Sequence, residues 1–334
     1  MAKLTPTSTF NGNGGMKMPV IGLGTWQGTN DEMELAVNAA LEAGYRHIDT
    51  AHVYGNEVGI GNVLRKWFDS GKLKREDIFI VTKCSPSHFR PEHIEKSLDE
   101  SLKRLQLDYV DMFLAHVPYG VAYPDGKPVP IGQVGLTRLD MNTDLEANWK
   151  VMETLVDKKK CKAIGVSNFN KSQVKRILDV ARIKPSNNQV ELYVYLQQRE
   201  LVEFCQANGI VVVAFGPIGS PGLLNAAVSR GTDSKEMNIQ SPMQDPVVLE
   251  IAKRHNKTAA QVLLRFLLQY GIVVIPKSSN AERLRENINI FDFELSSDEY
   301  SRLQALEKGE AGRQFGGSGL LKFATEHPEW PHPK

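Results

Sequence analysis

The sequence is short of the features that mark secreted and membrane-spanning proteins. It contains three cysteines, Cys84, Cys161 and Cys205, and no two of them form a CxxC pair. So sparse and odd a count argues against a disulfide framework and fits a reducing compartment. The segment from Met1 to Phe10 is polar, and the longest apolar stretch, near Ile210 to Phe215, is too short to span a bilayer. We therefore expect a cytoplasmic protein without a membrane partner.

An excess of charge of either sign is also absent. Lysine and arginine total 40, aspartate and glutamate total 39, and the net charge is +1 with neutral histidines. A nearly neutral chain lacks the electrostatic footprint of a nucleic-acid-binding protein, so we expect a small-molecule partner and no nucleic acid. Hydrophobic residues make up 41% and charged residues 24% of the 334 residues, the balance of a soluble globular protein.

Several common functional motifs are missing. Gly22-Leu23-Gly24 follows an apolar run, but a dinucleotide fingerprint needs a third glycine where Gln27 stands. The sequence has no GxxxxGK[ST] phosphate loop, no HExxH pair and no GxSxG elbow. A Rossmann-type site and a metal-dependent hydrolase are therefore disfavoured, and we expect no metal.

What the sequence does contain is a regular alternation of short apolar runs and longer segments at helical spacing. The predicted strands are Val20–Leu23, Arg46–Asp49, Ile78–Thr82, Val110–Leu114, Ala163–Val166, Asn188–Glu191, Val211–Ala214 and Val273–Ile275. The predicted helices are Asp31–Ala43, Glu57–Ser70, Glu92–Leu105, Leu145–Lys158, Lys171–Val180, Arg199–Asn208, Thr258–Gln269 and Ala281–Asn289. Continuous Val/Ile runs are typical of parallel strands buried on both faces. Eight strand–helix units predict an α/β fold, a (β/α)8 TIM barrel, with an open doubly wound sheet as the alternative.

Three segments add to this core. Residues Ser8 to Val20 predict an N-terminal β-hairpin, because Asn11 to Gly15 supply turn residues. Two long connections, Pro118 to Asn142 and Gly216 to Asp245, follow the fourth and seventh strands. In a barrel both lie at the C-terminal mouth, where loops carry function. No repeat or linker divides the chain, so we expect residues 1–334 to form one domain.

Polar residues stand at the C-terminal ends of three neighbouring predicted strands. Asp49 ends the second strand, with Tyr54 in the loop after it, Lys83 ends the third, and His116 follows the fourth. Barrel geometry sends all four to one face. A buried ammonium lowers the pKa of a nearby phenol, and Asp49 can keep the lysine charged. The set suits carbonyl reduction with Tyr54 as proton donor, whereas each residue alone has an ordinary structural role.

A group late in the chain suits phosphate. Lys277 ends the last strand, and a helix with Arg283 in its first turn begins near Asn280. A helix N-terminus with nearby cations attracts phosphate, and barrels often bind phosphate in this region. The alternative is a capped helix with a solvated basic face.

Another group suits a flat heterocycle. Ser167, Asn168 and Gln189 lie at the ends of two strands, and their polar groups can hold a carboxamide. Phe215 ends the next strand and can stack on a ring. Helix capping and core packing are the alternative roles.

Three long motifs, at Gly44–Glu57, Met152–Phe169 and Ile275–Asn287, resemble signatures of the aldo-keto reductase family, and the match covers nearly the whole chain. The resemblance implies a monomeric, aldose-reductase-like barrel that binds NADPH or NADP+ across its mouth without a Rossmann domain. It also implies specific residues. The implied catalytic residues are Asp49, Tyr54, Lys83 and His116. The implied cofactor-binding residues are Gly24, Thr25, Trp26, Ser167, Asn168, Gln189, Phe215, Gly216, Lys277, Ser278, Arg283, Glu286 and Asn287. The implied substrate-binding residues are Trp26, Val53, His116 and Val117.

The sequence departs from the family pattern in places. Phe215 stands where many members have tyrosine, and Gly216 where serine is common. Ser85 and Val117 stand where aldose-reductase-like members often have tryptophan. Two small residues would widen the mouth, so we expect a bulky lipophilic carbonyl, such as a steroid-like ketone or a long-chain enal. In the alternative, loop residues such as Tyr119 or Tyr123 fill this space.

Two other functions are conceivable within the resemblance. Steroid double-bond reduction is disfavoured by His116, because family members with that activity carry glutamate there. A nucleotide-binding structural or regulatory protein, such as a channel subunit or a lens protein, is less favoured because the four catalytic residues are intact. Carbonyl reduction is therefore the leading hypothesis.

Overall fold

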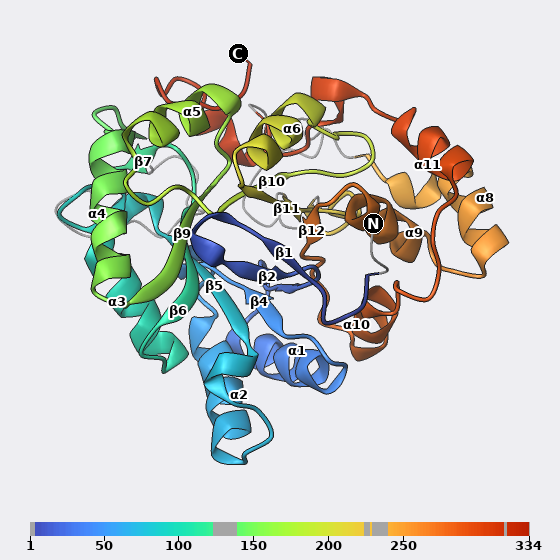
Figure 1. The fold of residues 1–334 in the computed structure, drawn as a ribbon, viewed down its shortest axis with the longest axis horizontal. Coiled ribbons are helices and arrows are strands. Elements are labelled where there is room, and N and C mark those ends of the chain that lie inside the picture. The colour runs from blue at the N-terminus through green and yellow to red at the C-terminus, as the bar shows by residue number, and fades with distance from the viewer. Residues whose placement is uncertain (1–3, 123–138, 224–227, 229–239, 317–318, 334) are drawn as a thin grey trace.

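A closed parallel barrel forms the centre of the computed structural model, which describes residues 4–122, 139–223, 228, 240–316 and 319–333 (Figure 1). Its strands, in hydrogen-bonded order, are β3 (Leu23–Gly24), β4 (His47–Asp49), β5 (Phe79–Cys84), β6 (Val110–Ala115), β9 (Cys161–Ser167), β10 (Asn187–Glu191), β11 (Val211–Phe215) and β12 (Val273–Val274). Bridges from Ile21 to Val274 and from Gly24 to Lys277 join the first strand to the last. The predicted (β/α)8 barrel is therefore confirmed, and the open sheet is excluded.

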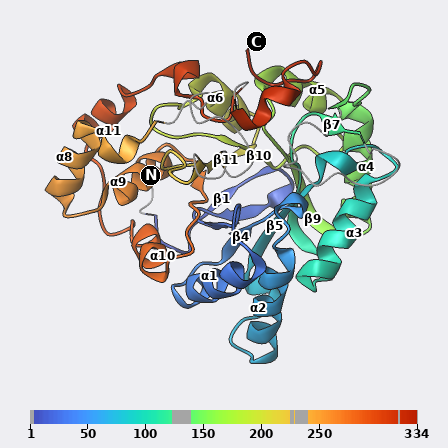
Figure 2. The same ribbon diagram turned by 180° about the vertical axis from the view of Figure 1, so that it is seen from behind.

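Helices surround this barrel in Figures 1 and 2. They are α1 (Asn30–Glu42), α2 (Glu57–Asp69), α3 (Ile94–Leu105), α4 (Leu145–Asp157), α5 (Lys171–Val180), α6 (Arg199–Ala207), α8 (Pro246–His255), α9 (Ala259–Gln269), α10 (Ala281–Ile288) and α11 (Ser297–Gln304). Each predicted helix is present, with ends that differ from the prediction by one or two residues at most. Helices α8 and α11 were not predicted from the sequence; both lie outside the repeating strand–helix units.

The first predicted strand needs a correction. It was expected at Val20 to Leu23, whereas the regular strand β3 covers Leu23–Gly24. Val20 and Gly22 instead exchange backbone hydrogen bonds with Val274, at the seam of the barrel. A Cβ on Gly24 would lie 2.7 Å from the carbonyl oxygen of Ile275, so only glycine lets the two strands approach this closely. Close packing therefore accounts for Gly24.

The N-terminal hairpin closes one end of the barrel. Strands β1 (Thr9–Asn11) and β2 (Lys17–Pro19) pair antiparallel, as predicted, and lie across the centre of the ring in Figure 1. The hairpin's Met16 and Met18 pack with apolar side chains inside the barrel. Asn13 donates to the carbonyl oxygens of Pro185 and Asn208, which precede β10 and β11. The hairpin thus covers the N-terminal ends of the strands and leaves the opposite end to the candidate site.

At that opposite end, the structure describes parts of both long connections. Within Pro118 to Asn142, β7 (Gly120–Val121) pairs with β8 (Leu139–Asp140), while residues 123–138, Tyr123 included, lie outside the described residues. Most of the connection from Gly216 to Asp245 also lies outside them. This end of the barrel faces the viewer in Figure 2.

The C-terminal segment folds back over β7 and β8. Tyr119, Ala324 and Trp330 form a small buried apolar cluster with Val117 packed against it. The His327 Nε2 lies 2.8 Å from the carbonyl oxygen of Asp140. Residues near the end of the chain therefore become part of the same end of the barrel as the candidate site. Among the described residues, no helix combines the length and the apolar character needed to cross a membrane.

Candidate active site

Four polar side chains come together where β4, β5 and β6 end. The Nζ of Lys83 donates to Asp49 Oδ1 at 2.5 Å and to the hydroxyl oxygen of Tyr54 at 3.4 Å. Tyr54 ends a short 3-10 helix, His52–Tyr54, that follows β4. The ring of His116, directly after β6, lies edge-on to the Tyr54 ring with centroids 5.7 Å apart. The structure thus places the four predicted catalytic residues side by side.

Lys83 and Asp49 form a buried ion pair beneath Tyr54. The two residues are 0% and 2% exposed, respectively. Lys83 also donates to the carbonyl oxygen of Thr50 at 2.9 Å, and Gln189 donates to Asp49 Oδ2 at 2.6 Å. Burial disfavours the ammonium, but the Asp49 carboxylate and the Tyr54 hydroxyl together outweigh burial and raise the pKa of Lys83. Lys83 therefore carries a fixed positive charge at neutral pH.

The pKa of Tyr54 is higher than the sequence analysis expected. Burial raises it, and this effect outweighs the lowering by the Lys83 ammonium. The Asp49 carboxylate behind the lysine raises it further. The expectation of a lowered pKa is therefore wrong for the protein without ligands, because it counted the charge and not the loss of water. The phenol is protonated at neutral pH, as a proton donor must be.

His116 is a neutral imidazole beside that phenol. Burial and the nearby Lys83 charge hold the pKa of His116 well below its ordinary value. Asn168 Nδ2 donates to the backbone oxygen of His116 at 2.9 Å, which fixes the loop after β6. A neutral imidazole carries one N–H, so His116 can donate one hydrogen bond to a substrate oxygen.

The three residues predicted to hold a carboxamide are linked to these four. Ser167 donates to the backbone oxygen of Gln189 at 2.9 Å, and Asn168 donates to the Ser167 hydroxyl at 3.1 Å. Asn168 has a left-handed backbone, with φ of 62°, which turns its side chain at the end of β9. Because Gln189 also donates to Asp49, the two groups of residues form one hydrogen-bonded network.

Three aromatic rings lie in a row next to the network. The Phe315 ring lies between Trp26 and Phe215, with centroid distances of 5.6 Å and 5.2 Å, and both contacts are edge-on. Phe215 ends β11 and Trp26 follows β3, so the C-terminal segment joins two separate parts of the barrel. Apolar surface therefore stands close to the polar group, as in many ligand sites.

The loop that carries Trp26 is fixed by buried polar contacts. The Thr25 hydroxyl donates to the backbone oxygen of Asp49 at 3.0 Å. Asn56 Nδ2 donates to the backbone oxygens of Thr25 and Gly28 at 2.8 and 2.9 Å. Asn56 was not among the residues predicted for the site, although it lies inside the first family-like motif. Asn56 holds the first loop against the segment that carries Tyr54.

The residues predicted to bind phosphate lie at the start of α10. Lys277 and Arg283 are exposed, and Asn280 caps the helix by accepting from the Arg283 backbone N–H. Ser278 Oγ accepts from Arg283 Nε at 3.4 Å, so these residues already form one group. Two cations beside free helical amides are the chemistry that phosphate requires. This donor set fits the phosphates of a nucleotide, and the Gly24–Lys277 bridge connects it to the first strand.

Glu286 and Asn287 lie farther along α10. Glu286 is half-buried, and Asn287 is 4% exposed. Gln261 of α9 donates to the Glu286 backbone oxygen at 3.0 Å, which ties this turn to the neighbouring helix. The structure thus keeps all five predicted residues of this group within one short segment.

Gly216 has a conformational reason to be glycine. Its φ is 61°, in the left-handed region, and a Cβ there would lie 2.5 Å from Ser220 Oγ. The positive φ and the close approach of Ser220 both favour glycine at this position.

Ser85 and Val117, which were expected to widen the mouth, and Val53, expected to bind substrate, differ in their burial and their neighbours. Ser85 is 2% exposed, and its hydroxyl lies 2.8 Å from that of Ser87, so it does not itself form a surface. Val117 is half-buried and borders the cluster of Tyr119, Ala324 and Trp330. Val53 is half-buried in the 3-10 helix that carries Tyr54. The C-terminal segment and Tyr119 therefore take up space next to Val117.

The C-terminal segment is held by a residue that the sequence analysis missed. Glu191 ends β10, and its carboxylate accepts from the backbone N–H groups of Gln314 and Phe315, each at 2.9 Å. Gln314 Nε2 also donates to the Tyr193 hydroxyl at 3.1 Å. A glutamate at the end of a buried strand was the available signal. Glu191 positions Phe315 in the row of rings.

Comparison with known proteins agrees with this geometry. The Aldo/keto reductase family profile matches residues 20–308. The chain belongs to the aldo/keto reductase family. It is thus a member of a family of NADP-dependent oxidoreductases that reduce carbonyl groups, and the resemblance inferred from the three motifs is confirmed.

Individual relatives match almost end to end. The chain is 41% identical over 295 residues to the mouse aldo-keto reductase family 1 member A1, covering 88% of this chain and 87% of the relative. It is 38% identical over 324 residues to human aldo-keto reductase family 1 member C4, covering 96% and 95%. The solved structure of the aldose reductase from Schistosoma japonicum superposes with a TM-score of 0.85 at 42% identity, covering 98% of this chain and 99% of that one.

The Glu191 contact makes stability depend on pH. Burial raises the pKa of Glu191 from 4.5 to about 7 in spite of its two N–H donors. The folded carboxyl then holds its proton more tightly than the unfolded one. The protonated Glu191 carboxyl stabilises the folded state, and this contribution is complete below about pH 4.5 and lost as the pH rises through about 7. Glu191→Gln should remove this pH dependence, which amounts to on the order of 3 kcal/mol of unfolding free energy.

Urea unfolding at several values between pH 5 and pH 8 measures the effect. The difference in unfolding free energy between wild type and Glu191→Gln should change with pH and level off above about pH 7. Glu200→Gln, an exposed change on α6, is the control and should leave the profile as it is. Parallel profiles for wild type and Glu191→Gln would contradict the assigned pKa.

Proposed function

We propose that this chain is an NADPH-dependent reductase of aldehydes and ketones in which Tyr54 donates the proton. The observation that carries the proposal is the buried Lys83–Asp49 pair held against the Tyr54 hydroxyl, with His116 alongside. This constellation lies at the C-terminal ends of the strands, where barrel enzymes place their reactive groups.

The four side chains have distinct tasks. Tyr54 passes its hydroxyl proton to the carbonyl oxygen of the substrate as negative charge develops there. The Lys83 ammonium stabilises the phenolate that remains, and Asp49 keeps Lys83 charged and in place. His116 donates its N–H to the same carbonyl oxygen and orients it. NADPH, when bound, supplies the hydride.

The cofactor would be held by residues from four strands. Ser167, Asn168 and Gln189 bind the carboxamide of the nicotinamide, and Phe215 stacks on its ring. The first loop, with Gly24, Thr25 and Trp26, borders the same region. Gly216 supplies backbone near the pyrophosphate.

The other half of the cofactor would lie at α10. Lys277, Ser278, Arg283 and Asn287 bind the adenosine phosphate, and Glu286 contacts the adenine. Support comes from the exposed cations beside the helix N-terminus. NADPH is preferred to NADH because only NADPH carries the additional phosphate that these cations can bind.

The substrate class follows from the apolar surroundings of Tyr54. Val53 directly precedes Tyr54, Val117 directly follows His116, and Trp26 packs edge-on against Phe315. A sugar needs many hydrogen-bond partners, which aliphatic and aromatic walls do not provide. We propose a bulky lipophilic carbonyl, such as a steroid-like ketone or a long-chain enal. The aldose reductase among the similar structures makes a sugar the competing class. A monomeric, cytosolic enzyme remains our expectation.

Removal of the Tyr54 hydroxyl tests the chemistry. Tyr54→Phe should lower kcat by roughly 10²- to 10⁴-fold, because the general acid is lost, while NADPH binding is retained. Steady-state NADPH oxidation with an aldehyde measures kcat, and fluorescence titration measures binding. Tyr45→Phe is the matched control, since it removes a buried hydroxyl that donates only to the Leu284 backbone oxygen. A Tyr54→Phe enzyme with near wild-type kcat would rule out this proton donor.

Arg283 tests the cofactor preference. Arg283→Ala should weaken NADPH binding by roughly 10- to 150-fold, the equivalent of one charge-assisted contact, and leave NADH binding nearly unchanged. Dissociation constants for both cofactors provide the measurement. Arg285→Ala, an exposed change on the same helix, should affect neither cofactor. An equal loss for both cofactors after Arg283→Ala would place Arg283 away from the additional phosphate.

A chain-length series of aldehydes tests the substrate class. Each buried methylene contributes about 0.8 kcal/mol, so kcat/KM should rise about fourfold per methylene until the site is filled. Val117→Trp should lower kcat/KM for the bulkiest ketones more than for a short aldehyde, which serves as the internal control. A flat series, or a preference for glucose-sized sugars, would contradict the proposed class.

A further inference from the structure

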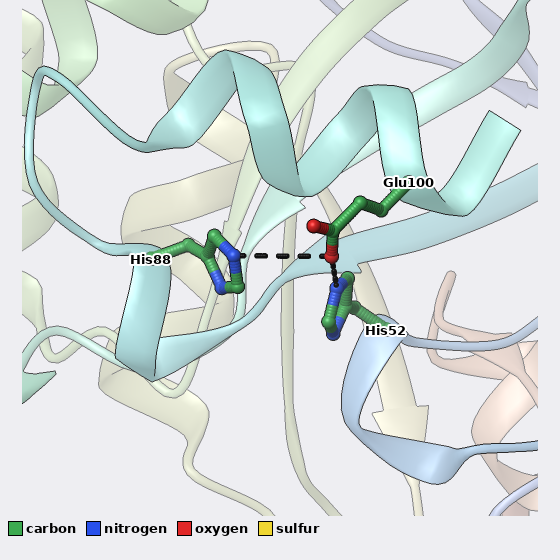
Figure 3. Close-up of side chains that lie close together, drawn as sticks. All are labelled: His52, His88 and Glu100. Atoms are coloured by element: carbon green, nitrogen blue, oxygen red, sulfur yellow. Dashed lines mark hydrogen bonds and ion pairs between the residues drawn. The ribbon is translucent and has the colours of Figure 1, made fainter. Parts of the chain in front are cut away.

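Two histidines and a glutamate form a cluster next to the candidate active site but apart from its reacting groups. His52 Nε2 lies 2.8 Å from Glu100 Oε2, and His88 Nε2 lies 3.9 Å from the same oxygen (Figure 3). The residues come from three elements: the 3-10 helix after β4, the 3-10 helix Pro86–His88 after β5, and α3. In Figure 3 both imidazoles point toward the carboxylate.

The spacing of the three groups is close to that of metal ligands. One nitrogen from each histidine and one oxygen of Glu100 all lie within 4.8 Å of one another. Ligands about 2.0 to 2.1 Å from a tetrahedral zinc ion lie roughly 3.3 Å apart. Side-chain shifts of about 1 Å would therefore bring the three atoms to that geometry. The Glu100 side chain has room to move, because it is 37% exposed on the surface of α3.

The two histidines are buried to different extents. The side chain of His88 is 1% exposed and that of His52 is 14% exposed. Their rings are 5.0 Å apart between centroids. A pair of imidazoles fixed by packing loses little side-chain freedom when a metal binds, so the protein already meets part of the cost of assembling the ligands.

The protonation states also suit metal binding. Burial lowers the pKa of His88 to about 4, and burial lowers that of His52 as well, so both rings are neutral at pH 7. Burial acts against the Glu100 carboxylate, but the His52 hydrogen bond and the neighbouring charges hold its pKa below the ordinary value. Neutral imidazole and ionised carboxylate are the forms that bind a metal.

Nearby positive charge opposes a cation at this place. Arg104 Nη1 lies 3.9 Å from Glu100 Oε2. Lys96 and His93 also act electrostatically on His88, and both lower its pKa. Arg104 is itself engaged by the buried Glu57 carboxylate at 2.7 Å. This partner offsets much of the Arg104 charge. The remaining repulsion favours a metal that forms strong bonds to nitrogen over one held by charge alone.

We propose that His52, His88 and Glu100 form a binding site for a divalent transition metal, with Zn²⁺ the best fit. Two imidazoles and one carboxylate supply three ligands, and water takes the fourth position, as in open zinc sites. Mg²⁺ and Ca²⁺ fit this site poorly, because both ions prefer ligand sets made only of oxygen atoms. No step of carbonyl reduction runs through this metal. Its site lies on the segment that continues into Val53 and Tyr54, so an occupied site would tie that segment to α3.

The sequence showed no sign of this site, because short-spaced ligand motifs such as HExxH are absent. The three ligands at positions 52, 88 and 100 are far apart in sequence and meet only because β4 and β5 are neighbours. Folding is therefore what creates this site.

Titration with ZnCl2 tests the proposal on the full chain after treatment with a chelator. Isothermal titration calorimetry should show one Zn²⁺ per wild-type chain, and Co²⁺ should give the visible absorption of a tetrahedral complex. Glu100→Gln should weaken Zn²⁺ binding by at least about 10-fold, because it removes a ligand charge while keeping the side-chain shape. Excess MgCl2 should not compete.

Asp99→Asn is the matched control, since it removes a carboxylate from the adjacent exposed position of α3 and should leave Zn²⁺ affinity unchanged. Glu100 is chosen for the main variant because, unlike His88, it is not needed to fill the core. Absence of stoichiometric Zn²⁺ binding by wild type would overturn the proposal. Equal affinity of wild type and Glu100→Gln would overturn it too, since Zn²⁺ would then bind elsewhere.

Discussion

The buried ion pair between Lys83 and Asp49 is the contact on which the candidate site depends. Two charges removed from water carry a large desolvation cost, which is repaid only by close geometry and by partners for the remaining polar atoms. The structure provides both, because the Thr50 carbonyl oxygen accepts from Lys83 and Gln189 donates to Asp49. Loss of one partner would leave the other charge uncompensated, at a cost of about 3 to 5 kcal/mol. The pair therefore requires β4, β5 and β10 to stay in register.

Closure of the barrel is what keeps those strands in register. The seam between β3 and β12 needs backbones in direct contact, and Gly24 permits it. The same seam places Lys277 beside the first loop, so the residues proposed to bind phosphate and the residues around Tyr54 belong to one connected barrel. A ligand that spans both regions would then meet groups that are already in position, which reduces the entropy lost on binding.

Much of this arrangement could be predicted from the sequence. Apolar runs alternating with helical segments imply a barrel, and barrel geometry then sends Asp49, Lys83 and His116 to one face. Helices α8 and α11 were missed although both carry start signals, with Pro246 after the capping Asp245 and the Ser296–Glu299 capping box. They lie outside the regular alternation of strands and helices on which the sequence prediction relied.

Other features depend on packing that a sequence does not display. The raised pKa of Tyr54 comes mainly from its burial, to which many segments contribute. The role of Glu191 depends on where a distant C-terminal segment lies, and the His52, His88 and Glu100 cluster depends on three elements meeting. Local patterns report the neighbours of a residue along the chain, whereas these properties are set by its neighbours in space.

The anchoring of the C-terminal segment has a practical consequence for handling the protein. Phe315 reaches the row of rings because Glu191 accepts from its backbone N–H and Tyr193 accepts from the neighbouring Gln314 side chain. Trp330 packs on Tyr119 close to the end of the chain. The hairpin of β1 and β2 instead covers the opposite end of the barrel. A purification tag or a surface-immobilisation linker therefore belongs at the N-terminus. There it is separated from the reacting groups by the full height of the barrel, whereas a C-terminal attachment would pull on the wall of the site itself.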